Sequence, residues 1–227
     1  MPKITVGLLL ALVLLLPLHV YGVTIQLPQT GQTTSYAAED DGALQRGVAW
    51  PNPRFTDNGD QTITDNLTGL MWEKSAYSGS WDINPIGGIS GSFTYENALL
   101  TTYYYNGINH LGYSDWRLPN KNELGSLINL GAPKQFEWLM SQGFTNVLYR
   151  RYWTSNKPIA VDMAEGSISR LYLNLFDYNN TYAWYVRGQS REGTLPKTGS
   201  IYCTTVPVWQ PCPSGSTEDG ALRNGTA

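Results

Sequence analysis

The chain has 227 residues, of which 41% are hydrophobic and 12% aromatic, so it can bury a core and is not disordered throughout. Only 15% of its residues are charged, and 15 Lys and Arg stand against 18 Asp and Glu, for a net charge of −3. This composition argues against a coiled coil and against a protein that binds nucleic acid through its charge, so we expect no nucleic-acid partner.

The first 22 residues have the pattern of a secretory signal peptide. Lys3 supplies a positive charge, an apolar run occupies residues 4–16, and Val20 and Gly22 stand at the −3 and −1 positions of a cleavage site. The run is short for a membrane span, so we expect a cleaved signal at 1–22; an uncleaved anchor is the alternative. The mature protein is then exported to the periplasm, the cell surface or the medium, with no membrane span.

Two short motifs occur twice in the chain. Leu-Pro-x-Thr-Gly stands at residues 27–31 and 195–199, and Asp-Gly-Ala-Leu stands at 41–44 and 219–222. Recurrence in the same order indicates an internal repeat. The first motif also resembles a sortase sorting signal, but its second copy is not followed by the apolar stretch and basic tail that such a signal needs.

The repeat suggests how the chain is divided. We expect a linker and repeat head at residues 23–53, one compact domain at 54–190, and the truncated start of a second repeat at 191–227. The two cysteines of the chain, Cys203 and Cys212, lie in the last segment. Because an exported protein meets an oxidising compartment, we expect them to form a disulfide.

The compact domain is predicted to open with a β-hairpin. Residues 55–57 and 61–64 favour strands, and the intervening Asn58-Gly59-Asp60 is a strong turn signal. A second turn is predicted at 66–69, and it leads into a buried strand at 70–72. Both features are specified by neighbouring residues alone.

Two main helices are predicted next. After a Ser- and Gly-rich loop at 75–93, a helix begins at Thr94 and covers residues 95–105. The second helix has Asn120 as its N-cap and Glu123 in the capping-box position. Apolar residues follow it at helical spacing, before Gly131 and Pro133 end it: Leu124, Leu127, Ile128 and Leu130.

The last third of the domain is predicted to consist of strands. Residues 152–155, 167–176 and 183–186 are rich in aromatic and β-branched side chains and alternate in character. We expect these segments to pair as antiparallel strands. The combination of short strands and two helices predicts an α+β fold.

Several motifs along the domain resemble one family. They are 55–60, 64–72, 114–120 with Glu123 and Leu124, 152–155, and 185–187. In order and spacing they are similar to the Lcl C-terminal-domain-like family, a domain of unknown function. That family is more distantly similar to the C-type-lectin-like fold of formylglycine-generating enzymes, which implies the same fold here. Residues 54–189 contain no cysteine, so the oxidase chemistry of those enzymes is not expected.

Most of the motif residues are expected to be structural, because large aromatics usually fill cores and charged motif residues usually form structural pairs. Arg117 is expected to be partly buried and paired, with Asp115 and Glu123 as the two candidate partners. The expected structural residues are Trp72, Asp115, Trp116, Arg117, Pro119, Glu123, Trp153 and Arg187.

Two segments are the candidate contact sites. The first is a predicted hairpin loop at 177–182, whose Tyr178, Asn179, Asn180 and Tyr182 combine rigid rings with adaptable amides. The second is the pair Arg150 and Arg151, which suits anionic groups and belongs to a region of seven basic side chains: Lys134, Arg150, Arg151, Lys157, Arg170, Arg187 and Arg191. For Tyr103, Tyr104 and Tyr105 we favour packing within the helix.

No catalytic or metal site is expected. Asp57, Asp60 and Asp65 lack the spacing of a calcium loop and are explained by turns. Outside the signal peptide His110 is the one histidine, and no Gly-x-Ser-x-Gly elbow is present. We expect no enzyme activity, no cofactor and no metal.

The resemblance implies a function, because the best-known member of the family is a collagen-like bacterial adhesin whose C-terminal domain binds sulfated glycosaminoglycans. We therefore expect an exported bacterial binding module, adhesin-like, that recognises glycans, sulfated polysaccharides or other extracellular polymers. The alternative is a non-catalytic structural or interaction repeat of a larger cell-surface or periplasmic protein, which associates with its own kind.

Overall fold

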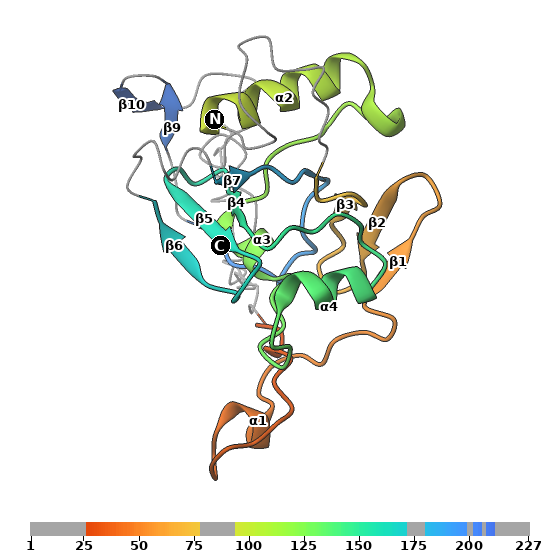
Figure 1. The fold of residues 1–227 in the computed structure, drawn as a ribbon, viewed down its shortest axis with the longest axis vertical. Helices are drawn as coiled ribbons and strands as arrows, with labels where there is room; N and C mark the ends of the chain where they lie inside the picture. The colour runs from red at the N-terminus through yellow and green to blue at the C-terminus, as the bar shows by residue number, and fades with distance from the viewer. Residues whose placement is uncertain (1–25, 78–93, 172–179, 199–201, 206–207, 212–227) are drawn as a thin grey trace, which may run out of the picture.

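The computed structural model in Figure 1 describes residues 26–77, 94–171 and 180–198, with the backbone of 202–205 and 208–211. The expected signal peptide and most of the loop expected at 75–93 lie outside the described residues. The described part mixes short helices with small sheets, which confirms the α+β class. Within this described part, no helix is long and apolar enough to cross a membrane.

The first of two four-stranded sheets is antiparallel and combines three early strands with one late strand. In spatial order its strands are β1 (Phe55–Asp57), β2 (Thr62–Asp65), β3 (Met71–Glu73) and β8 (Val186–Arg187). The predicted hairpin is confirmed, because β1 and β2 pair in antiparallel register. Ile63, Trp72 and Val186 lie opposite one another on adjacent strands and are fully buried, so this row faces the core.

The second sheet also has four strands. Its order is β6 (Ile168–Arg170), β5 (Ile159–Asp162), β4 (Arg151–Trp153) and β7 (Thr181–Tyr182). The expectation of antiparallel pairing alone is wrong, because β7 runs parallel to β4. The strand expected at 183–186 is wrong except for Val186: β7 ends at Tyr182 in the second sheet, residues 183–185 lie in no strand, and β8 begins at Val186 in the first sheet. Strand β5 was not predicted from the sequence.

Successive residues of the second sheet enter two different hydrophobic clusters. Tyr152 and Val161 belong to the first core, whereas their neighbours Trp153 and Ala160 belong to the second. The same alternation continues through residues 183–186. Neighbouring side chains of an extended chain point to opposite faces, and here both faces are buried. This is why these segments carry aromatic side chains at consecutive positions.

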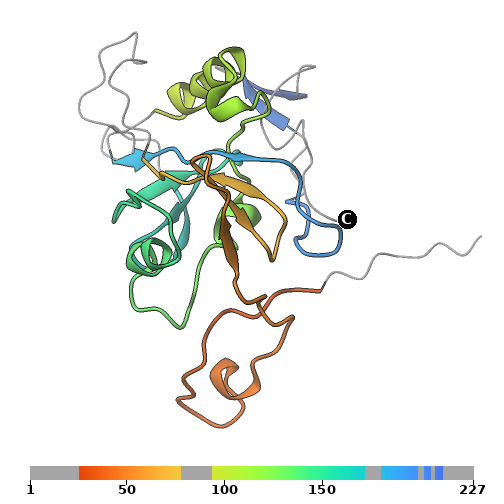
Figure 2. The ribbon, with the colours of Figure 1, turned by 90° about the vertical axis from the view of Figure 1, so that its right-hand side faces the viewer.

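Three of the four helices in the described part of the chain pack against the two cores, whereas the short first helix does not. The helices are α1 (Asp41–Leu44), α2 (Tyr95–Gly107), α3 (Lys121–Gly125) and α4 (Gln135–Ser141), with a 3-10 turn, η2 (His110–Gly112). The predicted start of α2 is confirmed, because the Thr94 side chain accepts a hydrogen bond from Asn97 N–H (3.1 Å). Figures 1 and 2 place α2 at one end of the molecule and α1 at the other.

The helix predicted from Asn120 is present but shorter than expected. Its capping box is confirmed: the Asn120 side chain accepts from Glu123 N–H (2.9 Å), and the Glu123 carboxylate accepts from Asn120 N–H (2.8 Å). The helix ends at Gly125: Leu127 N–H donates to the Leu124 carbonyl (3.2 Å) in a tighter turn, and the Ser126 carbonyl accepts from the Arg54 guanidinium (2.6 Å). Beyond it, Leu127 is buried in the first core and Ile128 packs against that core from turns, whereas Leu130 is 54% exposed.

A third main helix, α4, was not predicted. It begins two residues after Pro133, which the sequence analysis treated as the end of the preceding helix, and no side chain caps it. The loop before it is held instead by the Gln135 amide, which donates to the carbonyls of Asn129 and Ala132, both at 3.0 Å. These contacts join residues that the sequence gives no reason to pair.

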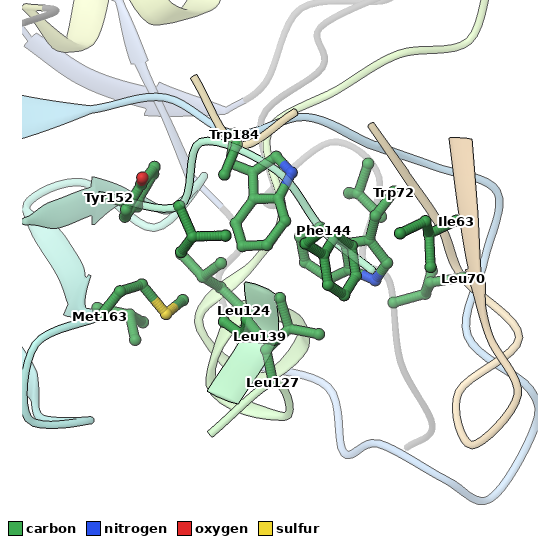
Figure 3. Close-up of a cluster of buried hydrophobic side chains, with 14 of the residues drawn as sticks. Ile63, Leu70, Trp72, Leu124, Leu127, Leu139, Phe144, Tyr152, Met163 and Trp184 are labelled. Atoms are coloured by element: carbon green, nitrogen blue, oxygen red, sulfur yellow. The ribbon is translucent and has the colours of Figure 1, made fainter. Parts of the chain in front are cut away.

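The first core lies between the two sheets. Figure 3 shows Trp184 between Tyr152 on one side and Trp72 on the other, with Leu124 of α3 and Leu139 of α4 beside them. The ring centroids of Trp184 and Trp72 are 5.4 Å apart, and the rings are tilted by 57°, a usual packing of aromatic pairs. Residues 183–185 therefore hold the two sheets together through Trp184.

The chain beyond β8 also packs into the first core. Leu195 is only 4% exposed and belongs to the same cluster as Trp72 and Trp184. This residue lies in the stretch expected to begin a second repeat, so that stretch contributes to the present unit as well. Leu27, at the same place in the first copy of the motif, is 59% exposed.

A two-stranded ribbon follows, and it bears on the expected disulfide. Its strands are β9 (Tyr202–Thr205) and β10 (Val208–Pro211), in antiparallel register with Cys203 opposite Gln210. The side chain of Cys203 and all of Cys212 lie outside the described residues. The disulfide therefore stays a prediction.

The burial of Leu195 gives a direct test of this arrangement. We expect Leu195→Ala to lower the free energy of unfolding by about 2–5 kcal/mol, because a buried leucine side chain leaves a cavity when it is truncated. Urea unfolding followed by tryptophan fluorescence measures the change. The matched control is Leu27→Ala, which we expect to change stability by less than about 0.5 kcal/mol, as for an exposed position. Equal losses in both variants would contradict the packing described.

Candidate functional site

The motif tryptophans are core residues. Trp72, Trp116 and Trp153 are all fully buried, the first in the first core and the other two in the second. Pro119 is buried too, and its carbonyl accepts from Ser155 N–H (2.8 Å), which ties the segment before α3 to the end of β4. These residues fix the frame and are not available to a ligand.

Arg117 pairs with Glu123, which decides between its two candidate partners. The two side chains form a buried bidentate pair with N–O distances of 2.7 and 2.8 Å. Arg117 also donates to the Gly188 carbonyl (2.7 Å). Asp115 pairs instead with Arg187 at the surface (2.6 Å). Both ion pairs therefore join parts of the fold to one another.

The basic region expected around Arg150 and Arg151 is largely neutralised. Four of its seven cations form ion pairs with carboxylates: Lys134 with Glu137, Arg151 with Asp162, Lys157 with Glu96, and Arg187 with Asp115. Arg150 is exposed, and its guanidinium donates to the neighbouring Tyr149 carbonyl (2.7 Å). The structure does not bring these side chains together as a group of unpaired cations.

The last two residues of the contact loop expected at 177–182 belong to a strand. Tyr178 and Asn179 lie outside the described residues, and Asn180 is half-buried. Tyr182 lies in β7 and packs against the first core, with its ring centroid 6.2 Å from that of Tyr152. Thr181 and Tyr182 pair in register with β4, and this pairing removes them from the expected loop.

Sequence reasoning missed a row of exposed side chains on α2. They are Leu100 (54% exposed), Tyr103 (54%), Tyr104 (44%) and Ile108 (52%). Positions i, i+3 and i+4 lie on one face of a helix, and Ile108 is the residue that follows α2 as its C-cap. We call these four exposed side chains the α2 apolar stripe. The packing expected for three consecutive tyrosines holds only for Tyr105, which is buried. The sequence did carry a signal for the stripe, because the predicted helix has apolar residues on two opposite faces.

The opposite face of α2 is fixed in the second core. Tyr95, Ala98 and Tyr105 are buried there, and the Tyr185 hydroxyl donates to the Ala98 carbonyl (3.2 Å). Asn106 binds both backbone groups of Trp116, accepting at 2.7 Å and donating at 2.9 Å. The α2 apolar stripe is therefore presented by a helix that is held in place at several points.

A buried carboxyl–imidazole pair supports the end of α2. Glu73 of β3 is 5% exposed, its Oε1 lies 3.1 Å from His110 Nε2, and its Oε2 has no described hydrogen-bond partner. The His110 ring stacks on Tyr105 with 3.8 Å between centroids and 18° between planes. Burial raises the pKa of the Glu73 carboxyl, and the hydrogen bond with His110 acts in the opposite direction. The pair joins η2 to the first sheet.

The three aspartates weighed as a calcium site are engaged separately. Asp57 pairs with Lys74 (2.6 Å), and this contact lowers the pKa of its carboxyl. Asp60 accepts from the hydroxyl of Tyr113 (2.8 Å), and Asp65 forms a buried pair with Arg54 (3.3 Å). Among the described residues, no group of three or more His, Cys, Asp or Glu side chains is placed to hold a metal ion.

Comparison with known proteins adds one finding. A family model described as the Lcl C-terminal domain matches residues 61–203. The chain belongs to the Lcl C-terminal domain family. The match includes every motif from the end of the first hairpin to Arg187, and it extends past Leu195 into the β9 strand. No curated protein and no solved structure matches the chain, so the C-type-lectin-like resemblance stays a prediction.

The Glu73–His110 pair in the Lcl C-terminal domain makes stability depend on pH. A carboxyl whose pKa is raised by folding binds more protons in the folded state, so its contribution is present at acid pH and is lost as the pH rises through the raised pKa. We expect Glu73→Gln to raise the thermal midpoint relative to the unsubstituted protein, by an amount that grows as the pH rises above about 4.5, the ordinary pKa of a glutamate carboxyl. Thermal unfolding followed by circular dichroism at several pH values measures it.

The matched control for this prediction is Glu137→Gln. Glu137 is exposed and pairs with Lys134 at the surface, so its loss should change the midpoint little and without this trend. The trend in Glu73→Gln is attributed to the burial of the Glu73 carboxyl, which raises its pKa, while the hydrogen bond with His110 acts in the opposite direction. A midpoint difference that is constant with pH would contradict the account.

Proposed function

We propose that this Lcl C-terminal domain is a non-catalytic binding module of an exported bacterial protein, and that the α2 apolar stripe binds the sugar rings of glycans. The observation that carries the proposal is the stripe itself: it has four large side chains, each between 44% and 54% exposed. Three of them lie on one face of the 13-residue α2, and the fourth, Ile108, follows its last residue. Contiguous exposed apolar surface on a soluble domain usually marks an interaction site.

The chemistry of the stripe suits carbohydrate. The C–H-rich face of a sugar ring packs against an aromatic ring, and the tyrosine hydroxyls can hydrogen-bond to sugar hydroxyls. Tyrosine has few rotatable bonds, so it loses little conformational entropy when a ligand binds. The opposite side of the helix is held by the contacts of Tyr105 and Asn106, so the helix itself need not reorganise.

The charges of the domain favour neutral sugars over sulfated ones. Four of the seven cations of residues 134–191 already pair with carboxylates, and the whole chain carries a net charge of −3. On α2 the one charged residue is Glu96, which pairs with Lys157. Binding through the stripe should therefore depend little on ionic strength.

We expect the full chain to bind neutral glycans on an array that also displays sulfated polysaccharides, with little change between low and high salt. The double variant Tyr103→Ala/Tyr104→Ala should weaken binding at least about tenfold, as expected when central aromatic anchors are lost. Isothermal titration with the best glycan from the array measures the change.

Tyr36→Ala is the matched control, because this tyrosine is 84% exposed and lies in the segment that carries α1, far from α2. It should bind as the unsubstituted protein does. Salt-sensitive binding to sulfated chains that is lost in Arg150→Ala/Arg151→Ala would overturn the stripe as the site. No binding to any glycan by a folded sample would overturn the function and leave the interaction-repeat alternative.

A further inference from the structure

The segment that carries α1 projects from the body of the domain. Figures 1 and 2 show that residues 27–50, which we call the arm, leave the body at the end where α4 lies and return to it there. The structure describes the whole arm, and its one buried residue is Gly42. Apart from Trp50 at the base, the large apolar side chains of the arm are exposed: Leu27 (59%), Tyr36 (84%), Leu44 (44%) and Val48 (38%). The arm therefore has no hydrophobic core of its own.

Hydrogen bonds nevertheless hold the arm in one conformation. The Asp40 carboxylate accepts from the backbone N–H groups of Tyr36, Ala37 and Ala43. Glu39 has φ 68°, a left-handed conformation that is costly for a residue other than glycine and persists only where neighbouring contacts enforce it. An ordered segment with exposed apolar side chains is preorganised for a partner, because it loses little conformational entropy on binding.

The base of the arm is joined to α4. The Trp50 ring packs against that of Trp138 on α4, with 5.6 Å between centroids, and the Arg54 guanidinium lies over the Trp50 ring at 4.1 Å. In the loop before α4, Leu130 N–H donates to the Thr30 carbonyl of the arm (2.9 Å). These contacts fix the position of the arm relative to α4.

The outer face of α4 is a second exposed apolar surface. Phe136 and Met140 are four residues apart on this helix and so lie on one face of it. The Phe136 ring packs edge-on against that of Tyr149, with 5.5 Å between centroids. Met140 is 41% and Tyr149 51% exposed, whereas Phe136 is partly buried against the first core. We call these three side chains the α4 platform, which the core holds in place.

The charges of the two surfaces are complementary. The arm carries one basic side chain against three acidic ones: Glu39, Asp40 and Asp41. Glu39 is exposed and forms no ion pair within the described part of the chain. Arg150 follows Tyr149 of the platform, and it too is exposed and has no carboxylate partner among the described residues. Opposite charges at the edges of two apolar surfaces favour their association and fix its register.

Because both surfaces belong to one rigid unit, two copies of the chain can bind each other reciprocally. If the arm of one copy lies on the platform of another, a two-fold axis places the second arm on the first platform, so each contact is made twice. Closed two-fold pairs are the commonest homo-oligomers of soluble proteins. The α2 apolar stripe lies at the other end of the molecule and stays exposed in such a pair.

We propose that the arm and the α4 platform are a docking surface for a second copy of this chain. Tyr36 and Leu44 of each arm pack on the platform of the other copy, and Glu39 of each arm faces Arg150 of the other copy. The occupant is a second copy because every copy presents both the acidic, apolar arm and the apolar platform with its unpaired cation. This inference does not depend on glycan binding, since none of its contacts involves the α2 apolar stripe.

Sedimentation velocity of the full chain at increasing concentration tests the proposal. The average mass should rise from that of one copy to that of two. The double variant Tyr36→Ala/Leu44→Ala should weaken the association at least about tenfold, because it removes the apolar contacts of both arms. Both side chains are exposed in the single chain, so the variant should keep its thermal midpoint at low concentration.

Charge exchange tests whether the contact is reciprocal. Glu39→Arg alone and Arg150→Glu alone should each weaken the association at least about tenfold, because like charges then face each other at both contacts. An equimolar mixture of the two variants should associate again. In the mixed pair the introduced arginine faces the introduced glutamate, and the native Glu39 faces the native Arg150.

The matched controls are Glu192→Arg and Arg170→Glu, which make the same charge changes at exposed residues outside the arm and the platform. Neither should weaken the association. A chain that stays a single copy at every concentration would overturn the proposal. So would an association that Tyr36→Ala/Leu44→Ala leaves unchanged, or a mixture of the two charge variants that does not associate. Glycan binding is measured through the α2 apolar stripe, so the two proposals fail separately.

Discussion

The buried pair of Arg117 and Glu123 is the interaction on which the rest of the domain depends. Charged groups can be buried only when each is paired and hydrogen-bonded, and here each partner has a second duty. Arg117 pairs through its backbone with Val186 and through its guanidinium with the Gly188 carbonyl, so it fixes both sides of β8. Glu123 caps the first turn of α3 by accepting from Asn120 N–H. One ion pair thus joins the first sheet to the helix that fills the first core.

The second constraint is the passage of the chain between the sheets. Residues 183–186 place alternate side chains in two cores, so each core limits how the other can pack. Trp184 joins the sheets inside the first core, and Tyr185 contacts α2 inside the second. Because the inner face of α2 is fully used in this way, its outer face is free for a ligand. Because the contacts of its inner face hold α2 in place, the helix can present an exposed apolar surface without moving.

The sequence predicted the features that neighbouring residues determine. The hairpin around Asn58 and Gly59 and the capping box of Asn120 and Glu123 need only local contacts, and the structure has both. The early end of α3 was not predicted, and the chain just beyond it is held by Arg54, 72 positions away from Ser126. The parallel pairing of β4 with β7 and the passage of residues 183–185 from the second sheet to the first are likewise set by contacts distant in sequence.

The candidate site was predicted less well than the fold, for a related reason. Composition pointed to Tyr182 and Arg151, but strand pairing places the first against the core, and Asp162 pairs with the second. The α2 apolar stripe was hidden because both faces of the helix are apolar, so periodicity alone did not show which face is buried. The repeat motifs were visible in the sequence, whereas the different burial of Leu27 and Leu195 was not.

The central claim is that the Arg117–Glu123 pair holds the frame, and a double-mutant cycle measures this most directly. Arg117→Met and Glu123→Gln should each lower the free energy of unfolding by about 3–5 kcal/mol, because each leaves a buried charge without its partner. The double variant should cost little more than either single one, which gives a coupling energy above about 2 kcal/mol. Additive losses, with a coupling energy below about 0.5 kcal/mol, would show that the two side chains act independently and would contradict the account.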